Sequence, residues 1–143
     1  MSKLTGMRSS TLLCVDDRQE SLQLRKDSLE PLGYSVVTAT SSSAAIATLE
    51  RMAVAAVLLE YKLEGMDAEA VAHHVKQRFP NQPIILLSGY SEMRESVLWL
   101  VDDYVMRSEP VQGLAQVIER VISRSRKFAP HSTEMAGTQR RTA

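Results

Sequence analysis

Residues 54–59 read VAAVLL, and all six are apolar. A strand with one face in water alternates apolar and polar residues, whereas a strand covered by helices on both faces is apolar throughout. A membrane-spanning helix needs about 20 apolar residues, and the apolar run that contains this stretch, 52–59, has only eight. The stretch therefore predicts a central strand of a parallel sheet with helices packed on both faces.

Similar runs of strand-forming residues lie on either side of this stretch. They are found at 11–15 (TLLCV), 34–39 (YSVVTA), 83–88 (PIILLS) and 103–106 (DYVM). Segments with helical character separate these runs, at about 22–32, 41–49, 68–79, 92–101 and 110–122. Expected boundary signals accompany the helices: Ser41 offers an N-cap, Gly33 and Pro80 end helices, and Pro110 opens one.

Five strands that alternate with five helices predict one doubly wound α/β domain over residues 11–126. In such a domain, ligands bind beyond the carboxyl ends of the strands. The length of 143 residues suits a single domain of this kind. The ends of the chain, 1–10 and 127–143, are polar and aperiodic, which predicts a flexible N-terminal arm and a flexible C-terminal tail.

The net charge of zero conceals an uneven distribution. Residues 1–10 hold two basic residues and no acid, and residues 126–143 hold four basic residues and one acid, so the body between them carries −5. An acidic body argues against a nucleic-acid partner, and too few residues follow the last helix for a helix-turn-helix domain. With a single cysteine, Cys14, and no apolar leader or span, we expect a cytoplasmic protein without a membrane segment.

Polar residues stand where the predicted strands end. Asp16 and Asp17 follow the first strand, Glu60 the third, Ser88 ends the fourth, and Arg107 follows the fifth. Because parallel strands end at one edge of the sheet, these side chains should converge there. Taken alone, the two aspartates could equally cap the helix that follows them.

The chain resembles the receiver domains of bacterial two-component response regulators over about residues 11–125. The segments that carry the resemblance are LLCVDD (12–17), LGYSV (32–36), VLLEYKLEGMDAEAV (57–71), ILLSGY (85–90) and VDDYVMRSEP (101–110). The resemblance implies a flavodoxin-like (βα)5 three-layer sandwich, with a parallel five-stranded sheet in the order 2-1-3-4-5. It also implies a signalling module and not an enzyme.

Site roles follow from the same resemblance. Glu60 takes the phosphoacceptor position, with Asp16 and Asp17 as the acidic pocket. Mg²⁺ would bind through Asp17 and Glu60, with Asp16 in support. A phosphoryl group from a histidine kinase would contact the residues at the Ser88 and Arg107 positions.

The resemblance further implies an output face. Tyr104 is the switch aromatic, and Trp99, Leu98 and Tyr104 lie on the face formed by the fourth helix, fifth strand and fifth helix. A homodimer or another protein partner would dock there. Trp99 stands between Leu98 and Leu100, and three consecutive large apolar residues cannot all face the core.

Departures from the family pattern fall on the predicted site. Glu60 replaces Asp, Arg107 replaces Lys, and Ser108 replaces Pro, so the 107–108 peptide bond should be trans. A guanidinium is a planar fork suited to a carboxylate. We therefore predict a direct Arg107–Glu60 link, the alternatives being that Arg107 faces solvent or pairs with Glu109. Lys62 is a further possible counter-ion, and these cations should make Mg²⁺ binding weak.

We therefore predict a stand-alone receiver-like signalling domain that acts through protein–protein contact, with a non-phosphorylatable or constitutively charged acidic site and no obligate cofactor. One alternative is a receiver that still accepts a phosphoryl group from a histidine kinase. Another is a small flavodoxin-like hydrolase, although the sequence lacks phosphate-binding glycine motifs. A flavin phosphate would be repelled by the carboxylates that follow the first strand.

Overall fold

The computed structural model describes residues 10–89 and 94–139, with side chains up to residue 126. Five parallel strands form one sheet in the order β2-β1-β3-β4-β5. Their bounds are β1 Thr11–Val15, β2 Ser35–Ala39, β3 Ala56–Glu60, β4 Ile84–Ser88 and β5 Asp103–Met106. The predicted fold class and strand order are confirmed.

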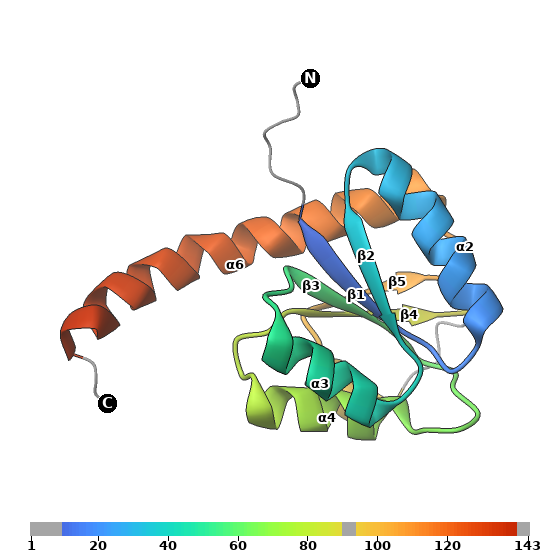
Figure 1. Ribbon diagram of the computed structural model, residues 1–143, viewed down its shortest axis with the longest axis horizontal. Helices are drawn as coiled ribbons and strands as arrows, with labels where there is room; N and C mark the ends of the chain where they lie inside the picture. The colour runs from blue at the N-terminus through green and yellow to red at the C-terminus, as the bar shows by residue number, and fades with distance from the viewer. Residues whose placement is uncertain (1–9, 90–93, 140–143) are drawn as a thin grey trace.

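Helices cover both faces of this sheet (Figure 1). Their bounds are α2 Gln19–Leu29, η1 Glu30–Leu32, α3 Ser42–Arg51, α4 Ala68–Arg78, α5 Glu95–Leu98 and α6 Val111–Gln139. Side chains of α2 and α6 pack in the apolar cluster on one face, and those of α3 and α4 pack in the cluster on the other. The result is the three-layer sandwich that the alternating pattern predicts.

The all-apolar stretch forms the centre of this arrangement. All five residues of β3 are buried, and β3 pairs with both β1 and β4. Leu58 packs in the cluster under α2 and α6, while Val57 and Leu59 pack in the cluster under α3 and α4. Alternate side chains therefore fill the two separate cores, which explains why no position in the strand is polar until Glu60.

The boundary signals act as predicted. The Ser41 hydroxyl accepts a hydrogen bond from the Ala44 N–H at 3.1 Å and caps α3. Gly33 adopts a φ of 105° and ends the η1 turn, a conformation that favours glycine. The Arg107–Ser108 peptide bond is trans.

Two helix predictions are wrong in their extent. The segment 92–101 was predicted as a helix, but α5 covers only Glu95–Leu98, and residues 92–93 lie outside the described part of the chain. Only Val97 in α5 is buried, so a longer helix would gain little packing. Trp99 and Leu100 instead form a turn, with the Leu100 N–H bonded to the Val97 carbonyl.

The other difference is at the C-terminus. We predicted a last helix over about 110–122, whereas α6 continues to Gln139 and runs past the sheet (Figure 1). The prediction relied on apolar residues facing the core, and Ile122 is the last buried one among the side chains described, which end at residue 126. The part of α6 that runs past the sheet lacks the helical spacing of apolar residues on which the prediction relied. Within residues 10–89 and 94–139, no helix is long and apolar enough to cross a membrane.

Candidate functional site

The predicted polar residues meet at the carboxyl edge of the sheet. Glu60 is the last residue of β3 and is paired in register with Leu87, and Ser88 is the last residue of β4. Arg107 follows β5, and its N–H donates to the Ser88 carbonyl. The parallel sheet therefore brings together residues that lie up to 91 positions apart, from Asp16 to Arg107.

The centre of the site is an ion pair between Glu60 and Arg107. The Arg107 Nε donates to Glu60 Oε1 at 3.3 Å, and Nη2 donates to Glu60 Oε2. The Glu60 side chain is 5% exposed and that of Arg107 is 45% exposed. The predicted direct link is confirmed, and it is bidentate, the geometry in which a guanidinium binds a carboxylate most strongly.

Neither alternative position of Arg107 is observed. The guanidinium passes over Gly89, where an added Cβ would lie 3.1 Å from Arg107 Nη1. Glu109, the other acidic candidate, lies beside Gly113 at the start of α6. The glycine at position 89 thus gives the Arg107 side chain room to reach Glu60.

The loop after β3 adds to the surroundings of Glu60. The Lys62 N–H donates to Glu60 Oε2 at 3.3 Å, so both carboxylate oxygens accept hydrogen bonds. The Lys62 side chain is exposed, and its role as a counter-ion stays a prediction.

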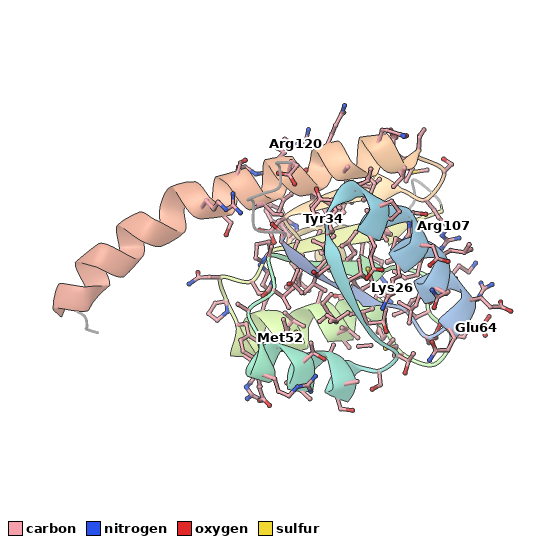
Figure 2. All side chains as sticks on the ribbon, turned by 45° about the horizontal axis from the view of Figure 1, so that its top comes forward. Lys26, Tyr34, Met52, Glu64, Arg107 and Arg120 are labelled. Carbon is pink, nitrogen blue, oxygen red and sulfur yellow. The ribbon has the colours of Figure 1, made fainter. Side chains whose placement is uncertain are left out.

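Asp17 ties the end of β1 to the loop between β3 and α4. Its Oδ2 accepts hydrogen bonds from the N–H groups of Glu64 and Gly65, both at 2.6 Å. Its Oδ1 is buried and has no hydrogen-bond partner. Figure 2 shows Glu64 and Arg107 at the same end of the molecule. Backbone donors are not visible in a sequence, so the pattern of residues could not reveal this contact.

Asp16 is the second carboxylate buried at this edge. Its Oδ1 accepts a hydrogen bond from the Arg18 N–H at 3.0 Å. Burial raises the pKa of Asp16, and the nearby charges of Glu60 and Asp17 raise it further, while the Arg18 hydrogen bond opposes them. Helix α2 begins after Arg18 with no side-chain cap, so neither aspartate acts as the helix cap considered above.

The arrangement offers few ligands to a divalent metal ion. Among the described residues, no three Asp, Glu, His or Cys side chains form a group that could hold one. Glu60 is already engaged by Arg107, and one oxygen of Asp17 is taken by two N–H groups. Among the side chains that the structure describes, Asp17 Oδ1 is the one buried oxygen without a hydrogen-bond partner. It would give Mg²⁺ a minimal set of protein ligands, since the ion uses one or two carboxylates alongside its waters.

The remaining predicted residues are divided between the site and the surface. Ser88 is buried at the carboxyl edge. Trp99 is 80% exposed and Tyr104 is 47% exposed, while Leu98 is half-buried. Their exposure agrees with the expectation that the three apolar residues at 98–100 cannot all face the core.

Comparisons with known proteins agree with this architecture. The family model for the response regulator receiver domain matches residues 12–119. The sensor protein GacS of Pseudomonas syringae pv. syringae is 30% identical over 119 residues, which are 78% of this chain and 13% of that protein. The regulatory protein PhoP of Bacillus subtilis, which directs alkaline phosphatase synthesis, is 27% identical over 124 residues, 85% of this chain and 52% of PhoP. The chain thus spans about half the length of PhoP and 13% of the length of GacS.

Solved structures extend the comparison. The Thermotoga maritima response regulator TrrA, in complex with Mg²⁺ and BeF, is 26% identical with a TM-score of 0.72, covering 78% of this chain and 98% of TrrA. A CheY-like receiver domain from Methanospirillum hungatei is 25% identical with a TM-score of 0.76, covering 85% of this chain and all of that one.

Proposed function

Because the chain belongs to the response regulator receiver family, we propose that it is a receiver-like signalling module in which a built-in ion pair replaces the phosphorylated state. Receiver domains are signalling modules of two-component systems that interact with histidine kinases, and they are not enzymes of the usual kind. We further propose that Glu60 occupies the phosphoacceptor position and that Arg107 is its lasting partner. The bidentate contact between the buried Glu60 carboxylate and the half-exposed Arg107 guanidinium is the observation that carries the proposal.

The chemistry of Glu60 supports this interpretation. A carboxylate that accepts a phosphoryl group acts as a nucleophile, but the Arg107 guanidinium binds both oxygens of Glu60 and neutralises the charge that makes them nucleophilic. Glutamate also extends one methylene further than aspartate. Displacements of about 1 Å can slow a positioned reaction by about 10²-fold. Phosphoryl transfer to Glu60 should therefore be slow or absent.

The charge of the pair supports a fixed signalling state. A phosphoryl group would bring about −1.5 to −2 charges at neutral pH, whereas Glu60 supplies one negative charge that Arg107 balances. The link between β3 and β5 that Arg107 makes does not depend on a kinase. With Glu60 engaged and no group of three ligands among the described residues, we propose that Mg²⁺ binds weakly at most.

We propose that the module acts by protein contact through the face that carries Trp99, Leu98 and Tyr104, either with a signalling partner or with a second copy. An indole that is 80% exposed is the largest apolar group on the described surface that lacks cover. If the face is used, Trp99→Ala should abolish self-association or partner binding. Unchanged association of that variant would exclude this face. We place the module in the cytoplasm, where the buried thiol of Cys14 would stay reduced.

Intact-mass spectrometry tests the central proposal. The wild-type chain is incubated with acetyl phosphate and Mg²⁺, in parallel with Glu60→Asp and with Glu60→Asp combined with Arg107→Lys. We expect no phosphorylated wild-type protein, and a phosphorylated fraction in the double variant that exceeds that in Glu60→Asp. Glu64→Asp, in the exposed loop beside the site, is the matched control and should behave as wild type.

Phosphorylation of the wild-type chain at Glu60 would overturn the proposal and favour a responsive receiver. Fragment-ion analysis locates the phosphoryl group, because Asp16 and Asp17 are neighbouring carboxylates.

A further inference from the structure

A groove of about 540 Å³ lies at the opposite edge of the sheet from Glu60. It is bounded by the end of α3, the loops that lead into β3 and β4, and the middle of α6. Because all five strands are parallel, the loops that precede strands and the residues that follow them lie at opposite edges. Figure 2 shows Met52, which lines the groove, on the far side of the molecule from Arg107. The groove is therefore separate from the site described above.

The floor of the groove is apolar, and its walls are mixed polar and apolar. Val54 and Ile122 are buried beneath it, while Phe79 is half-buried and Met52 is 39% exposed. Covering apolar surface that is still exposed to water favours binding. An apolar side chain placed between Met52 and Phe79 would cover this surface.

One wall of the groove is rigid. Pro80 and Pro83 fix the backbone after α4, since proline restricts its own φ and the residue before it. The Gln82 carbonyl in this loop accepts a hydrogen bond from Lys76 Nζ at 2.6 Å. Binding to a wall that is already ordered costs little conformational entropy. The loop between α4 and β4 is thus preorganised, and it would not have to change conformation when a ligand binds.

The charged residues that line the groove are both basic. Its lining residues include two cations, Arg78 and Arg126, and no carboxylate. Arg78 already pairs with Glu50, just outside the groove. In the part of the chain whose side chains are described, no carboxylate pairs with Arg126. An anionic group bound beside the apolar floor would supply the partner that Arg126 lacks.

We propose that this groove docks an acidic segment of a partner protein, which inserts an apolar side chain and pairs a carboxylate with Arg126. A small carboxylate ligand fits less well. Ala53, Arg78 and Arg126 are exposed along the rim, whereas small-molecule sites bury most of their ligand. A peptide segment covers an open groove more completely. The inference is independent of the Glu60–Arg107 pair.

Selection from a phage-displayed library of random peptides on the full chain tests the inference. We expect enriched peptides to combine Asp or Glu with a neighbouring Leu, Ile or Phe. Synthetic copies should bind wild type at least tenfold more tightly than they bind Ala53→Glu, which narrows the groove and adds a negative charge, or Arg126→Gln. Amide NMR signals of Ala53 and Gln82 should shift in the wild-type titration.

Ala47→Glu and Arg51→Gln are the matched controls, because both residues are exposed on α3 and neither lines the groove. Both should bind the peptides as wild type does. The inference fails if no acidic–apolar peptides are enriched, if Ala53→Glu binds them unchanged, or if sedimentation shows that wild type self-associates through the groove. Competition by hexanoate as effective as by the peptides would assign the groove to a small carboxylate and would also overturn it.

Discussion

The two edges of the sheet use charge in opposite ways. At the carboxyl edge, Glu60 is buried and is held by Arg107, while Asp16 and Asp17 lie beside it. At the amino edge, a groove has an apolar floor and basic residues in its lining, and hydrogen bonds there support the backbone of its wall. The charged groups of the first edge pair with each other inside the site, whereas those of the second edge hold a loop in place and lie along the rim of the groove. The following predictions test this contrast.

Removal of Arg107 should produce the largest effect. Arg107→Ala leaves the buried carboxylate of Glu60 without its cation, and we expect the free energy of unfolding to fall by about 2–3 kcal/mol. The expected loss is below the cost for a fully buried pair because Arg107 is 45% exposed. Urea denaturation monitored by circular dichroism measures it.

The double variant Glu60→Gln with Arg107→Ala distinguishes two costs. One is the loss of the attraction between Glu60 and Arg107, and the other is the burial of an unpaired Glu60 carboxylate. If the cost of Arg107→Ala is mainly the unpaired charge, the double variant should be more stable than Arg107→Ala alone. Equal stability of the two would mean that the pair contributes little and that the carboxyl edge does not depend on it.

At the amino edge, Asp102 should matter through the backbone. Its Oδ2 accepts hydrogen bonds from the Ile84 N–H at 2.7 Å and from Lys76 Nζ at 3.1 Å. Asp102→Ala leaves the buried Ile84 N–H without an acceptor and should lower the free energy of unfolding by about 1–2 kcal/mol. Asp102→Asn keeps an acceptor oxygen and should lose less than half as much in the same urea assay. A larger loss for Asp102→Asn than for Asp102→Ala would contradict the backbone role.

The same contrast explains what the sequence could predict. The all-apolar run at 54–59 predicted the central strand, since a strand that is buried on both faces is apolar at every position. The acidic and basic residues after the strands predicted the carboxyl edge and the Glu60–Arg107 link, because parallel strands end together. Every residue type except proline carries a backbone N–H, so the sequence did not predict the hydrogen bonds that the Glu64 and Gly65 N–H groups donate to Asp17.

Features that depend on tertiary packing were harder to predict. The short α5 was overestimated because its apolar residues form a continuous run without the spacing that fixes a helix length. The extension of α6 past residue 126 carries no run of apolar residues at helical spacing in the sequence. The groove combines residues from α3, two loops and α6, and no local pattern marks such a combination.

Asp16 offers a pH test of the carboxyl edge. Its pKa is raised in the folded protein by burial and by the neighbouring charges of Glu60 and Asp17. Between its unfolded and folded pKa values, the folded state binds more protons, so this group lowers stability as the pH rises through that window. Asp16→Asn removes the penalty, keeps an acceptor for the Arg18 N–H, and should raise stability at pH 7 by about 1 kcal/mol.

The advantage of Asp16→Asn should shrink as the pH falls toward the unfolded carboxyl pKa of about 3.9. Urea titrations between pH 4 and 8 measure the difference. Asp27→Asn, on the exposed surface of α2, is the control and should change stability by less than about 0.5 kcal/mol at any pH. A destabilised Asp16→Asn at pH 7 would show that the charge is favourable where it lies.

Gly89 gives the smallest and most specific effect. An alanine Cβ there would lie 3.1 Å from Arg107 Nη1, so the guanidinium would have to shift by a few tenths of an ångström. At Gly65 the nearest atom, Asp17 Oδ2, is 3.7 Å from such a Cβ, which is ordinary contact. Replacing glycine with alanine where the backbone allows it stabilises by about 0.4–1 kcal/mol through the unfolded state.

Gly65→Ala should therefore show this gain, whereas Gly89→Ala should lose about 0.5 kcal/mol of it to strain against Arg107. In the Arg107→Ala background the strain has no source, and Gly89→Ala should behave as Gly65→Ala does. The double-mutant cycle in urea isolates the coupling between positions 89 and 107. If the cost of Gly89→Ala persists without Arg107, the glycine serves the backbone and not the ion pair, because the three atoms nearest to the added methyl group all belong to the guanidinium.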